Sequence, residues 1–441
     1  MSKIFKAYDV RGIYPQEINE EIVYKIGKGF IEEFGFSNVV VGRDVRKSSE
    51  SLFKALCKGI CDSGANVIEI GVVSTPLIYF AVSKYNYDGA IMVTASHNPA
   101  EYNGLKFTRE KGIPIFYANG INKVHERIGN IDDSSVEIRG KVIQIDVLKD
   151  FEDWILRSLK PIKDLNVVLD FSNGMGGIFA NTILKSLPIN FHFLNEDLDG
   201  SFPNHPPNPA ENKNLIQAKN KILEVNADFG AVFDGDCDRV FFLDEKGERV
   251  APDILMSLLG EFLLKDSDKK VIVHDLRSSW AAKENLVNNG AKLIETKVGY
   301  PSIKSVMRNN DALFGGELSG HFFFGDNNNN ESPIRCLLIL VEILTSKGLK
   351  LSEIVKPFNK FFPTGEINIE VEDADLVLQK IEEKFSDYDV CKLDGIKVTT
   401  DDFWFNVRKS NTEPIIRITA EGRTNEAMEK IKAEILEIAK N

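Results

Sequence analysis

The stretch Asn38–Asp44, which reads NVVVGRD, sets a pattern that recurs twice more along the 441-residue chain. Asn166–Asp170 (NVVLD) and Lys270–Asp275 (KVIVHD) have the same form. Each is a short, apolar and β-branched run that ends in polar turn residues, which is typical of a buried strand at the start of a βα unit. Because the strands alternate with helical patterns and recur at spacings of about 100 to 130 residues, the sequence predicts three α/β domains.

The last part of the chain follows a different pattern. Apolar and polar residues alternate in Glu366–Val371, as in an antiparallel strand with one exposed face, and Ile416, Ile418 and Ala420 repeat that period. A helical pattern then closes the chain, so the sequence predicts a smaller α+β domain there. The expected α/β domains are residues 1–143, 144–249 and 250–361, and the expected α+β domain is 362–441.

The composition is that of a globular protein, with 43% hydrophobic and 27% charged residues. Lys and Arg number 54 and Asp and Glu 66, and this net charge of −12 argues against nucleic acid as a partner. The longest apolar run, Cys336–Leu344, is too short to span a bilayer. The five cysteines form no Cys-x-x-Cys pair and the N-terminus has no apolar signal segment, so we expect a cytoplasmic protein.

The first segment that could carry chemistry is Val93–Pro99 (VTASHNP). Ser96 stands where the apolar run Ala90–Val93 breaks into an Asn-Pro turn, so we expect its hydroxyl at a sheet edge, where α/β folds place their sites. An ordinary strand-to-turn junction explains the same residues. His97 is adjacent in sequence, but adjacency does not position a base, so a Ser-His-Asp triad is unsupported.

The second segment, Ala231–Arg239 (AVFDGDCDR), carries more information. Asp234, Asp236 and Asp238 alternate after an apolar run, and Gly235 permits a tight bend that brings their oxygens together. Ligands that are all oxygen indicate Mg²⁺, Mn²⁺ or Ca²⁺. The alternative is a solvated acidic turn, although three carboxylates beside an apolar strand are costly without a counter-charge.

The same aspartates occupy the first, third and fifth positions of an EF-hand loop, and Glu245 falls at the twelfth. The sixth position requires glycine but holds Arg239, and Val240–Leu243 has the pattern of a strand where an EF-hand loop is still coordinating calcium. The sequence therefore predicts a strand, a metal-binding loop and a second strand.

Two further segments are weaker signals when each is considered alone. In Phe314–His321 (FGGELSGH), glycines flank side chains suited to sugar hydroxyls, although a glycine-rich turn with a satisfied histidine fits equally well. In Arg408–Pro414 (RKSNTEP), two cations precede three small hydrogen-bonding side chains, which suits a phosphate or an exposed basic turn. With one of the four segments in each expected domain, the combination favours phosphoryl transfer to a phosphosugar.

In this order and at these separations, the segments resemble the α-D-phosphohexomutase family, most closely its bacterial phosphomannomutase/phosphoglucomutase branch. The resemblance runs nearly end to end and also includes Ala7–Gly12, Gly42–Asp44, Tyr102–Lys106 and Asp199–Pro209. It implies three α/β domains and a smaller C-terminal domain around a central cleft. It further implies a phosphosugar substrate. We expect a monomer or weak homodimer with no membrane and no nucleic acid as partner.

The resemblance also implies a mechanism. Ser96 would be phosphorylated and bound to Mg²⁺ together with Asp234, Asp236 and Asp238. The phosphoserine would convert a hexose 1- or 6-phosphate into hexose 1,6-bisphosphate and recover a phosphoryl group from the other end, without net hydrolysis. The residues implied to surround the transferring group are Arg11, His97, Lys106 and Arg239. Lys106 would be the general base, provided that cations such as Arg11 lower its pKa.

Substrate recognition is implied for a second set of residues. Glu317 and Ser319 would bind sugar hydroxyls beside His321. The residues implied to hold the phosphate that is not reacting are Arg408, Ser410, Asn411 and Thr412. The remaining expected substrate-binding residues are Tyr8, Arg277, Lys297 and Tyr300.

Three departures from the branch affect the substrate rather than the chemistry. Arg277 stands where lysine is common, Tyr300 replaces a frequent histidine, and an asparagine tract follows His321. The Gly-Glu-Leu-Ser-Gly segment is more similar to mannose and glucose enzymes than to glucosamine enzymes, so we expect mannose or glucose phosphates. The alternatives are a phosphoglucosamine mutase with the same mechanism and a catalytically silent homologue that binds Ca²⁺ or sugar.

Overall fold

The computed structural model describes residues 2–131, 137–157, 159–160, 162, 164–410 and 415–440. Its contacts divide the chain into two compact units. The first unit comprises Met1–Val250 and Ser319–Leu351, and the second comprises Ala251–Leu318 and Ser352–Asn441. Each unit is described by itself.

The N-terminal sheet of the first unit is mixed, with strand order β1-β5-β4-β2-β3-β7 and β6 beside β5. Strands β2, β3, β4 and β7 are parallel, whereas β5 is antiparallel to both β1 and β4. The strands are β1 (Val10–Ile13), β2 (Asn38–Arg43), β3 (Asn66–Val72), β4 (Gly89–Val93), β5 (Tyr102–Arg109), β6 (Pro114–Ile115) and β7 (Val142–Gln144). The helices are α1 (Glu20–Phe34), α2 (Ser49–Asp62), α3 (Thr75–Lys84) and α4 (Ile121–Ile128).

A second mixed sheet in this unit has the order β12-β11-β10-β8-β9. Strands β8, β9 and β10 are parallel, and β11 returns antiparallel to β10. The strands are β8 (Asn166–Asp170), β9 (Asn190–Leu194), β10 (Phe229–Phe233), β11 (Val240–Asp244) and β12 (Arg249–Val250). The helices along this part are α5 (Leu148–Leu156) and α6 (Ile216–Val225). The hairpin between β10 and β11 confirms the predicted strand, loop and strand around the three aspartates.

The first unit also contains the segment after residue 318. It forms the hairpin of β16 (Phe322–Phe324) with β17 (Asn330–Glu331), followed by α10 (Pro333–Lys347). The asparagine tract is therefore only partly a loop, because Asn330 pairs with Phe324 and its side-chain amide donates to the Lys111 carbonyl.

The second unit combines a parallel sheet with an antiparallel one. The parallel strands are β13 (Val271–Asp275), β14 (Lys292–Thr296) and β15 (Phe314–Gly316), with helices α7 (Pro252–Lys265), α8 (Trp280–Asn288) and α9 (Tyr300–Asn309). The antiparallel sheet has the order β18-β22-β21-β20-β19. Its strands are β18 (Phe362–Glu370), β19 (Asp389–Cys391), β20 (Ile396–Thr399), β21 (Phe403–Lys409) and β22 (Ile415–Gly422).

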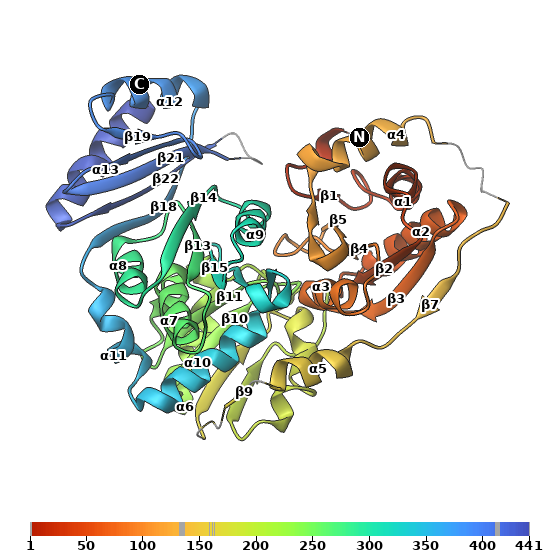
Figure 1. Ribbon diagram of the computed structural model, residues 1–441, viewed down its shortest axis with the longest axis horizontal. Helices are drawn as coiled ribbons and strands as arrows, with labels where there is room; N and C mark the ends of the chain where they lie inside the picture. Colours follow the sequence, from red (N-terminus) through yellow and green to blue (C-terminus); the bar gives the residue numbers. More distant parts are fainter. Residues whose placement is uncertain are drawn as a thin grey trace. The chain divides into compact units, whose positions relative to one another are not determined.

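Two helices, α12 (Ala374–Lys384) and α13 (Asn425–Lys440), pack on one face of the antiparallel sheet (Figure 1). Ile381 of α12 and Ile435 of α13 are fully buried in one core with Ile416 of β22, while the other face of β18 is largely exposed. This one-sided burial is the reason for the alternating pattern in the sequence.

The fold class predicted from the sequence is confirmed, with three α/β domains followed by a C-terminal domain built on an antiparallel sheet. The three β-branched stretches are strands β2, β8 and β13. The predicted domain boundaries stay predictions. In the part of the chain that the structure describes, every helix is too short or too polar to cross a membrane.

Candidate active site

Ser96 lies in the loop just after β4, a strand that is buried along its whole length. Ser96 is fully buried, with a relative solvent accessibility of 0%. Its φ of +52° is in the left-handed region, which costs a residue other than glycine about 1–2 kcal/mol and persists only where neighbours hold it. The Ser96 amide donates to Thr94 Oγ1 at 2.9 Å. The loop thus holds the hydroxyl in a fixed, buried position.

The Ser96 hydroxyl meets the aspartate loop. Its Oγ donates to Asp234 Oδ2 at 3.2 Å, although the two residues are 138 positions apart, and lies 3.3 Å from His97 Nδ1. The loops also touch through their backbones, since a Cβ atom on Gly235 would lie 2.5 Å from the Ser96 carbonyl oxygen. Glycine is therefore required at 235 for this close approach, and not only for the bend expected from the sequence.

The aspartate loop connects β10 to β11 and turns back on its own first carboxylate. Asp234 Oδ1 accepts from the backbone amides of Asp238 and Arg239, both at 3.1 Å. One oxygen from each of Asp234, Asp236 and Asp238 lies within 4.8 Å of the others, and all three residues are buried. The loop gathers the three carboxylates as the sequence analysis expected.

These carboxylates fit a hard divalent cation. Asp236 Oδ1 and Asp238 Oδ1 are buried and accept no hydrogen bond from the described residues. Burial, together with the charges of Asp238 and Asp236, raises the pKa of Asp234 well above its usual range. A cation bound to all three would satisfy the orphaned oxygens and keep the trio ionised, which is the ligand set that Mg²⁺ prefers.

Lys106 on β5 is buried against the same aspartates. Its Nζ donates to Asp236 Oδ2 at 2.6 Å and to Asp238 Oδ2 at 2.5 Å. Burial disfavours the ammonium form, but the two carboxylates outweigh burial and raise the pKa of Lys106 above its ordinary value. The lowered pKa that a general base would need is therefore not found in this arrangement, and the general-base role stays a prediction.

Two histidines and two arginines border the carboxylates. Arg239 Nε donates to His321 Nε2 at 3.0 Å, so His321 Nδ1 is the nitrogen that donates to the Asp238 carbonyl at 3.1 Å. Burial lowers the pKa of His321 to about 3, which keeps the ring neutral. Burial and the Arg239 charge likewise lower the pKa of His97 well below its usual range.

The second arginine, Arg11 on β1, is held by partners that the sequence analysis did not include. Arg11 Nε donates to Asp9 Oδ2 at 2.9 Å, and one terminal nitrogen donates to Asn98 Oδ1 at 2.6 Å. Asn98 belongs to the serine loop, so Arg11 is tied to the same loop as Ser96. The first unit therefore brings together all the residues expected around the transferring group: Arg11, Ser96, His97, Lys106, Arg239 and the three aspartates.

A separate cluster of charges lies in the second unit. Arg277 forms two bonds to the Asp275 carboxylate, at 3.2 and 2.7 Å, and donates to Glu366 Oε2 at 2.7 Å. Glu366 Oε2 also accepts from Arg408 at 3.0 Å, while Oε1 accepts from Arg417 at 3.2 Å. Three guanidiniums therefore meet at the single Glu366 carboxylate, and such a group of planar donors suits an anion.

The remaining expected substrate residues are placed as follows. Ser410 Oγ accepts from Arg417 at 3.3 Å, so it adjoins the arginine cluster. Glu317 is buried at the end of β15, Lys297 precedes α9, and Tyr300 begins α9. Ser319 belongs to the first unit, as does Tyr8, which is partly buried before β1. Asn411 and Thr412 lie outside the described residues.

Several site residues were missed by sequence analysis. Thr75, at the start of α3, donates its hydroxyl to Asp236 Oδ2 at 2.6 Å, and its amide donates to the Asp236 carbonyl. Glu366 and Arg417 lie on neighbouring antiparallel strands and were not distinguished from an ordinary polar strand face. Arg46 contacts the serine loop directly. The only signal for it in the sequence is its place just beyond Gly42–Asp44, where β2 ends.

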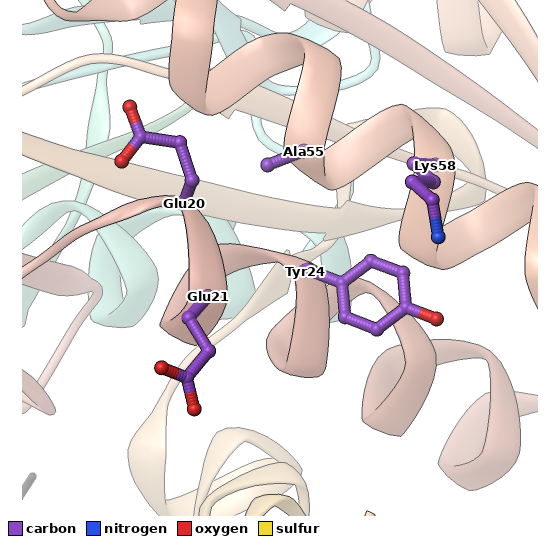
Figure 2. Close-up of a pocket in the computed structure, with 5 residues that line it drawn as sticks. All are labelled: Glu20, Glu21, Tyr24, Ala55 and Lys58. Carbon is purple, nitrogen blue, oxygen red and sulfur yellow. The ribbon is translucent and has the colours of Figure 1, made fainter. Parts of the chain in front are cut away.

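A shallow pocket of about 310 Å³ lies between α1 and α2 in the first unit (Figure 2). It is lined by Glu20, Glu21, Tyr24, Ala55 and Lys58. The Tyr24 hydroxyl and the Lys58 ammonium both donate to Asp62, at 3.0 and 2.6 Å. The pocket contains none of the expected site residues, and these polar groups are already engaged in local bonds.

Profiles of one family match the chain in succession. Phosphoglucomutase/phosphomannomutase, alpha/beta/alpha domain I, matches residues 2–135, domain II matches 148–247 and domain III matches 251–361. The C-terminal domain of the same family matches residues 366–438. The matches follow one another in the order of the three α/β domains and the C-terminal domain.

Individual relatives agree with these profiles. A phosphomannomutase of Methanocaldococcus jannaschii is 35% identical over 98% of this chain and 96% of its own length. A phosphomannomutase of Escherichia coli K12 is 36% identical over 95% of this chain and 94% of its own length. The structure of a phosphoglucomutase/phosphomannomutase family protein from Burkholderia thailandensis superposes with a TM-score of 0.91 at 29% identity, over 100% of this chain and 98% of that chain. The chain therefore belongs to the phosphoglucomutase/phosphomannomutase family and is a phosphohexomutase.

Proposed function

We propose that the protein interconverts hexose 1-phosphate and hexose 6-phosphate, with mannose or glucose as the sugar, through a phosphoserine at Ser96. The observation that carries this proposal is the buried contact of 3.2 Å between Ser96 Oγ and Asp234 Oδ2. A hydroxyl in that position has a carboxylate cluster on one side and Arg11, Lys106 and Arg239 nearby. Phosphoryl transfer needs such a combination, because it depends on positioning and on neutralising the charge of the oxygens.

The reaction consists of two transfers that balance each other. In the first, the bond between phosphorus and Ser96 Oγ breaks and a bond to the free sugar hydroxyl forms, which yields hexose 1,6-bisphosphate. In the second, Ser96 Oγ takes the phosphoryl group from the other end of the reoriented bisphosphate. In the first transfer the sugar hydroxyl loses a proton and Ser96 Oγ gains one, and in the second Ser96 Oγ loses its proton and the released sugar hydroxyl gains one, so water is not consumed. Added hexose 1,6-bisphosphate would phosphorylate any protein that has lost its phosphate.

The aspartates would hold Mg²⁺ in this scheme. Asp234, Asp236 and Asp238, with the phosphate on Ser96, supply oxygen ligands, and the cation would neutralise charge on the transferring group. While Asp236 and Asp238 keep the Lys106 side chain protonated, its ammonium group attracts phosphate oxygens. To act as the general base, Lys106 must lose these two partners, because they are what raises its pKa.

The arginine cluster of the second unit would bind the phosphate that does not react. Its support is the three guanidinium groups that meet at Glu366, together with the buried Nε of Arg408, which has no acceptor among the described residues. Arg277, Arg408 and Ser410 were expected as substrate-binding residues, and Arg417 joins them through its contact with Ser410. The roles of Asn411 and Thr412 in the same task rest on the family resemblance.

The choice of sugar is tested by comparing rates. The purified protein is incubated with Mg²⁺, a trace of hexose 1,6-bisphosphate and the 1-phosphate of mannose, glucose, glucosamine or N-acetylglucosamine. We expect the 6-phosphate to form fastest from mannose or glucose. A preference for glucosamine would replace the proposed sugar and keep the mechanism. The absence of product from every sugar, with no phosphate gained on the protein, would favour the silent homologue.

Replacing Arg408 with lysine is expected to raise the KM for hexose 1-phosphate by about 10- to 100-fold and to change kcat much less. The lysine keeps the charge but loses the planar pair of donors that grips two phosphate oxygens, which is worth roughly 1.5–3 kcal/mol. Steady-state kinetics measure both parameters. Arg423→Lys is the control, because Arg423 stacks on Trp280 in the same unit and has no contact with Glu366 among the described residues. An unchanged KM in Arg408→Lys would refute the phosphate role.

A further inference from the structure

Arg46 is a fully buried arginine in the loop between β2 and α2, and its side chain has a relative solvent accessibility of 0%. All five of its side-chain N–H groups have acceptors. One terminal nitrogen donates to the carbonyls of Ser96 and Asn98 at 2.8 and 2.6 Å, and the other donates to those of Pro99 and Tyr102 at 2.6 and 3.0 Å. Arg46 Nε donates to Asp44 Oδ2 at 3.2 Å. One guanidinium therefore binds four carbonyls of the serine loop and its exit.

The guanidinium itself has little freedom to move. Asp44 Oδ1 accepts from the Arg46 amide at 3.0 Å, and the ring of Phe202 lies 5.0 Å from the guanidinium carbon. Gly200 packs directly against the backbone of Val45 and Arg46. A Cβ atom at position 200 would lie 2.4 Å from the Val45 carbonyl oxygen and 2.5 Å from Arg46 Cα. A group held on all sides in this way can impose a conformation on the loop that it binds.

The loop needs such a constraint at Ser96. The serine adopts a φ of +52°, a conformation that L-residues other than glycine rarely maintain unaided. Its carbonyl oxygen is bound by Arg46 and also faces the backbone of Gly235. If that carbonyl were released, the peptide could rotate toward an ordinary conformation and carry Oγ away from Asp234.

We infer that Arg46 is a positioning residue for phosphoryl transfer, which fixes the Ser96 carbonyl and thereby directs the Ser96 hydroxyl at the aspartate loop. This inference rests on the proposed role of Ser96 as the phosphoryl carrier. Arg46 does not touch the reacting atoms, and its effect passes through the backbone of Ser96. A lysine cannot replace it, because an ammonium has three N–H groups on a flexible stem and cannot reach four carbonyls and a carboxylate at once.

The experiment compares Arg46→Lys with the unmodified protein in two assays. We expect kcat to fall by about 10- to 100-fold, as for a displacement of a reacting group by about 1 Å, while the KM for hexose 1-phosphate changes less than about threefold. Intact mass spectrometry should show that phosphorylation of Ser96 by hexose 1,6-bisphosphate slows by the same factor as kcat. Rates are expressed per folded protein, from the fraction that melts cooperatively.

Arg249→Lys is the matched control, because Arg249 stacks on Phe241 at 4.4 Å and donates to the Ala210 carbonyl in the same unit. It should keep both rates. If Arg46→Lys does not fold, Phe202→Leu removes only the ring beside the guanidinium and should slow Ser96 phosphorylation by about 3- to 10-fold.

The outcomes separate the inference from the proposed function. Phosphorylation of Ser96 at the normal rate in the folded Arg46 variant, or in Phe202→Leu when that variant stands in for it, would overturn the inference and leave the proposed function intact. A rise in KM with kcat unchanged would also overturn it, since that result indicates a substrate-binding role. Failure of Ser96 in the unmodified protein to accept phosphate would instead overturn the proposed function.

Discussion

The Ser96→Ala variant is expected to lose at least about 10³-fold in kcat, because it has no hydroxyl to carry the phosphoryl group between the two transfers. Hexose 1,6-bisphosphate should add one phosphoryl group to the unmodified protein and none to the variant. Stability should change little. The variant loses one hydrogen bond to Asp234, worth roughly 1 kcal/mol, and alanine must keep the same left-handed φ.

The measurements are conversion of hexose 1-phosphate to hexose 6-phosphate, intact mass after incubation with the bisphosphate, and thermal unfolding. Ser257→Ala is a suitable control, because Ser257 is equally buried, with a relative accessibility of 0%. Ser257 lies on α7, and its hydroxyl donates to the Ala282 carbonyl of α8. Both variants should show a similar small shift in melting temperature, and only Ser96→Ala should lose turnover. Normal turnover by Ser96→Ala would exclude Ser96 as the carrier.

The Asp236→Asn variant is expected to weaken Mg²⁺ binding by at least about tenfold and to lower kcat by about 10²- to 10³-fold. The substitution removes one charge from the trio while keeping the size of the side chain. It also leaves Lys106 with one carboxylate partner in place of two. Metal affinity and activity should therefore fall together. High Mg²⁺ concentrations should restore only the part of the loss that comes from incomplete occupancy.

Metal affinity is measured by calorimetric titration with Mg²⁺ or Mn²⁺, and activity is measured across the same concentrations. Asp170→Asn is the matched control, because Asp170 is a buried aspartate at the end of the adjacent strand β8 and pairs with His205 and Asn195 instead of the trio. Its metal affinity should be unchanged. Full activity of the unmodified protein after thorough chelation would show that the aspartates do not act through a cation.

Much of the fold could be predicted because buried strands are recognisable in the sequence as short apolar runs. Strands β2, β8 and β13 are flanked by other strands and covered by helices, so their residues are apolar on both faces. The rejection of an EF-hand also followed from local pattern. Val240–Leu243 is too apolar for a calcium loop, and it forms β11, which pairs with β10.

The site was less predictable where it depends on contacts between distant residues. Arg46 binds carbonyl groups, and the partners of a backbone carbonyl leave no mark in the sequence. Glu366 resembles any exposed residue of an alternating strand until Arg277 and Arg408 are placed beside it. The pKa of Lys106 depends on contacts of the same kind. Cations were expected near it, but two carboxylates lie closer and decide the sign.

The close approach of Gly235 to the Ser96 carbonyl has a consequence for how this enzyme can change. Because main chain meets main chain there, the spacing between the backbones of the serine loop and the aspartate loop does not depend on the rotamer of any side chain at that point. A methyl group at position 235 would collide with the Ser96 carbonyl and force the two loops apart. Variation in sugar choice therefore has to come from other parts of the molecule, where side chains can be exchanged without disturbing this spacing.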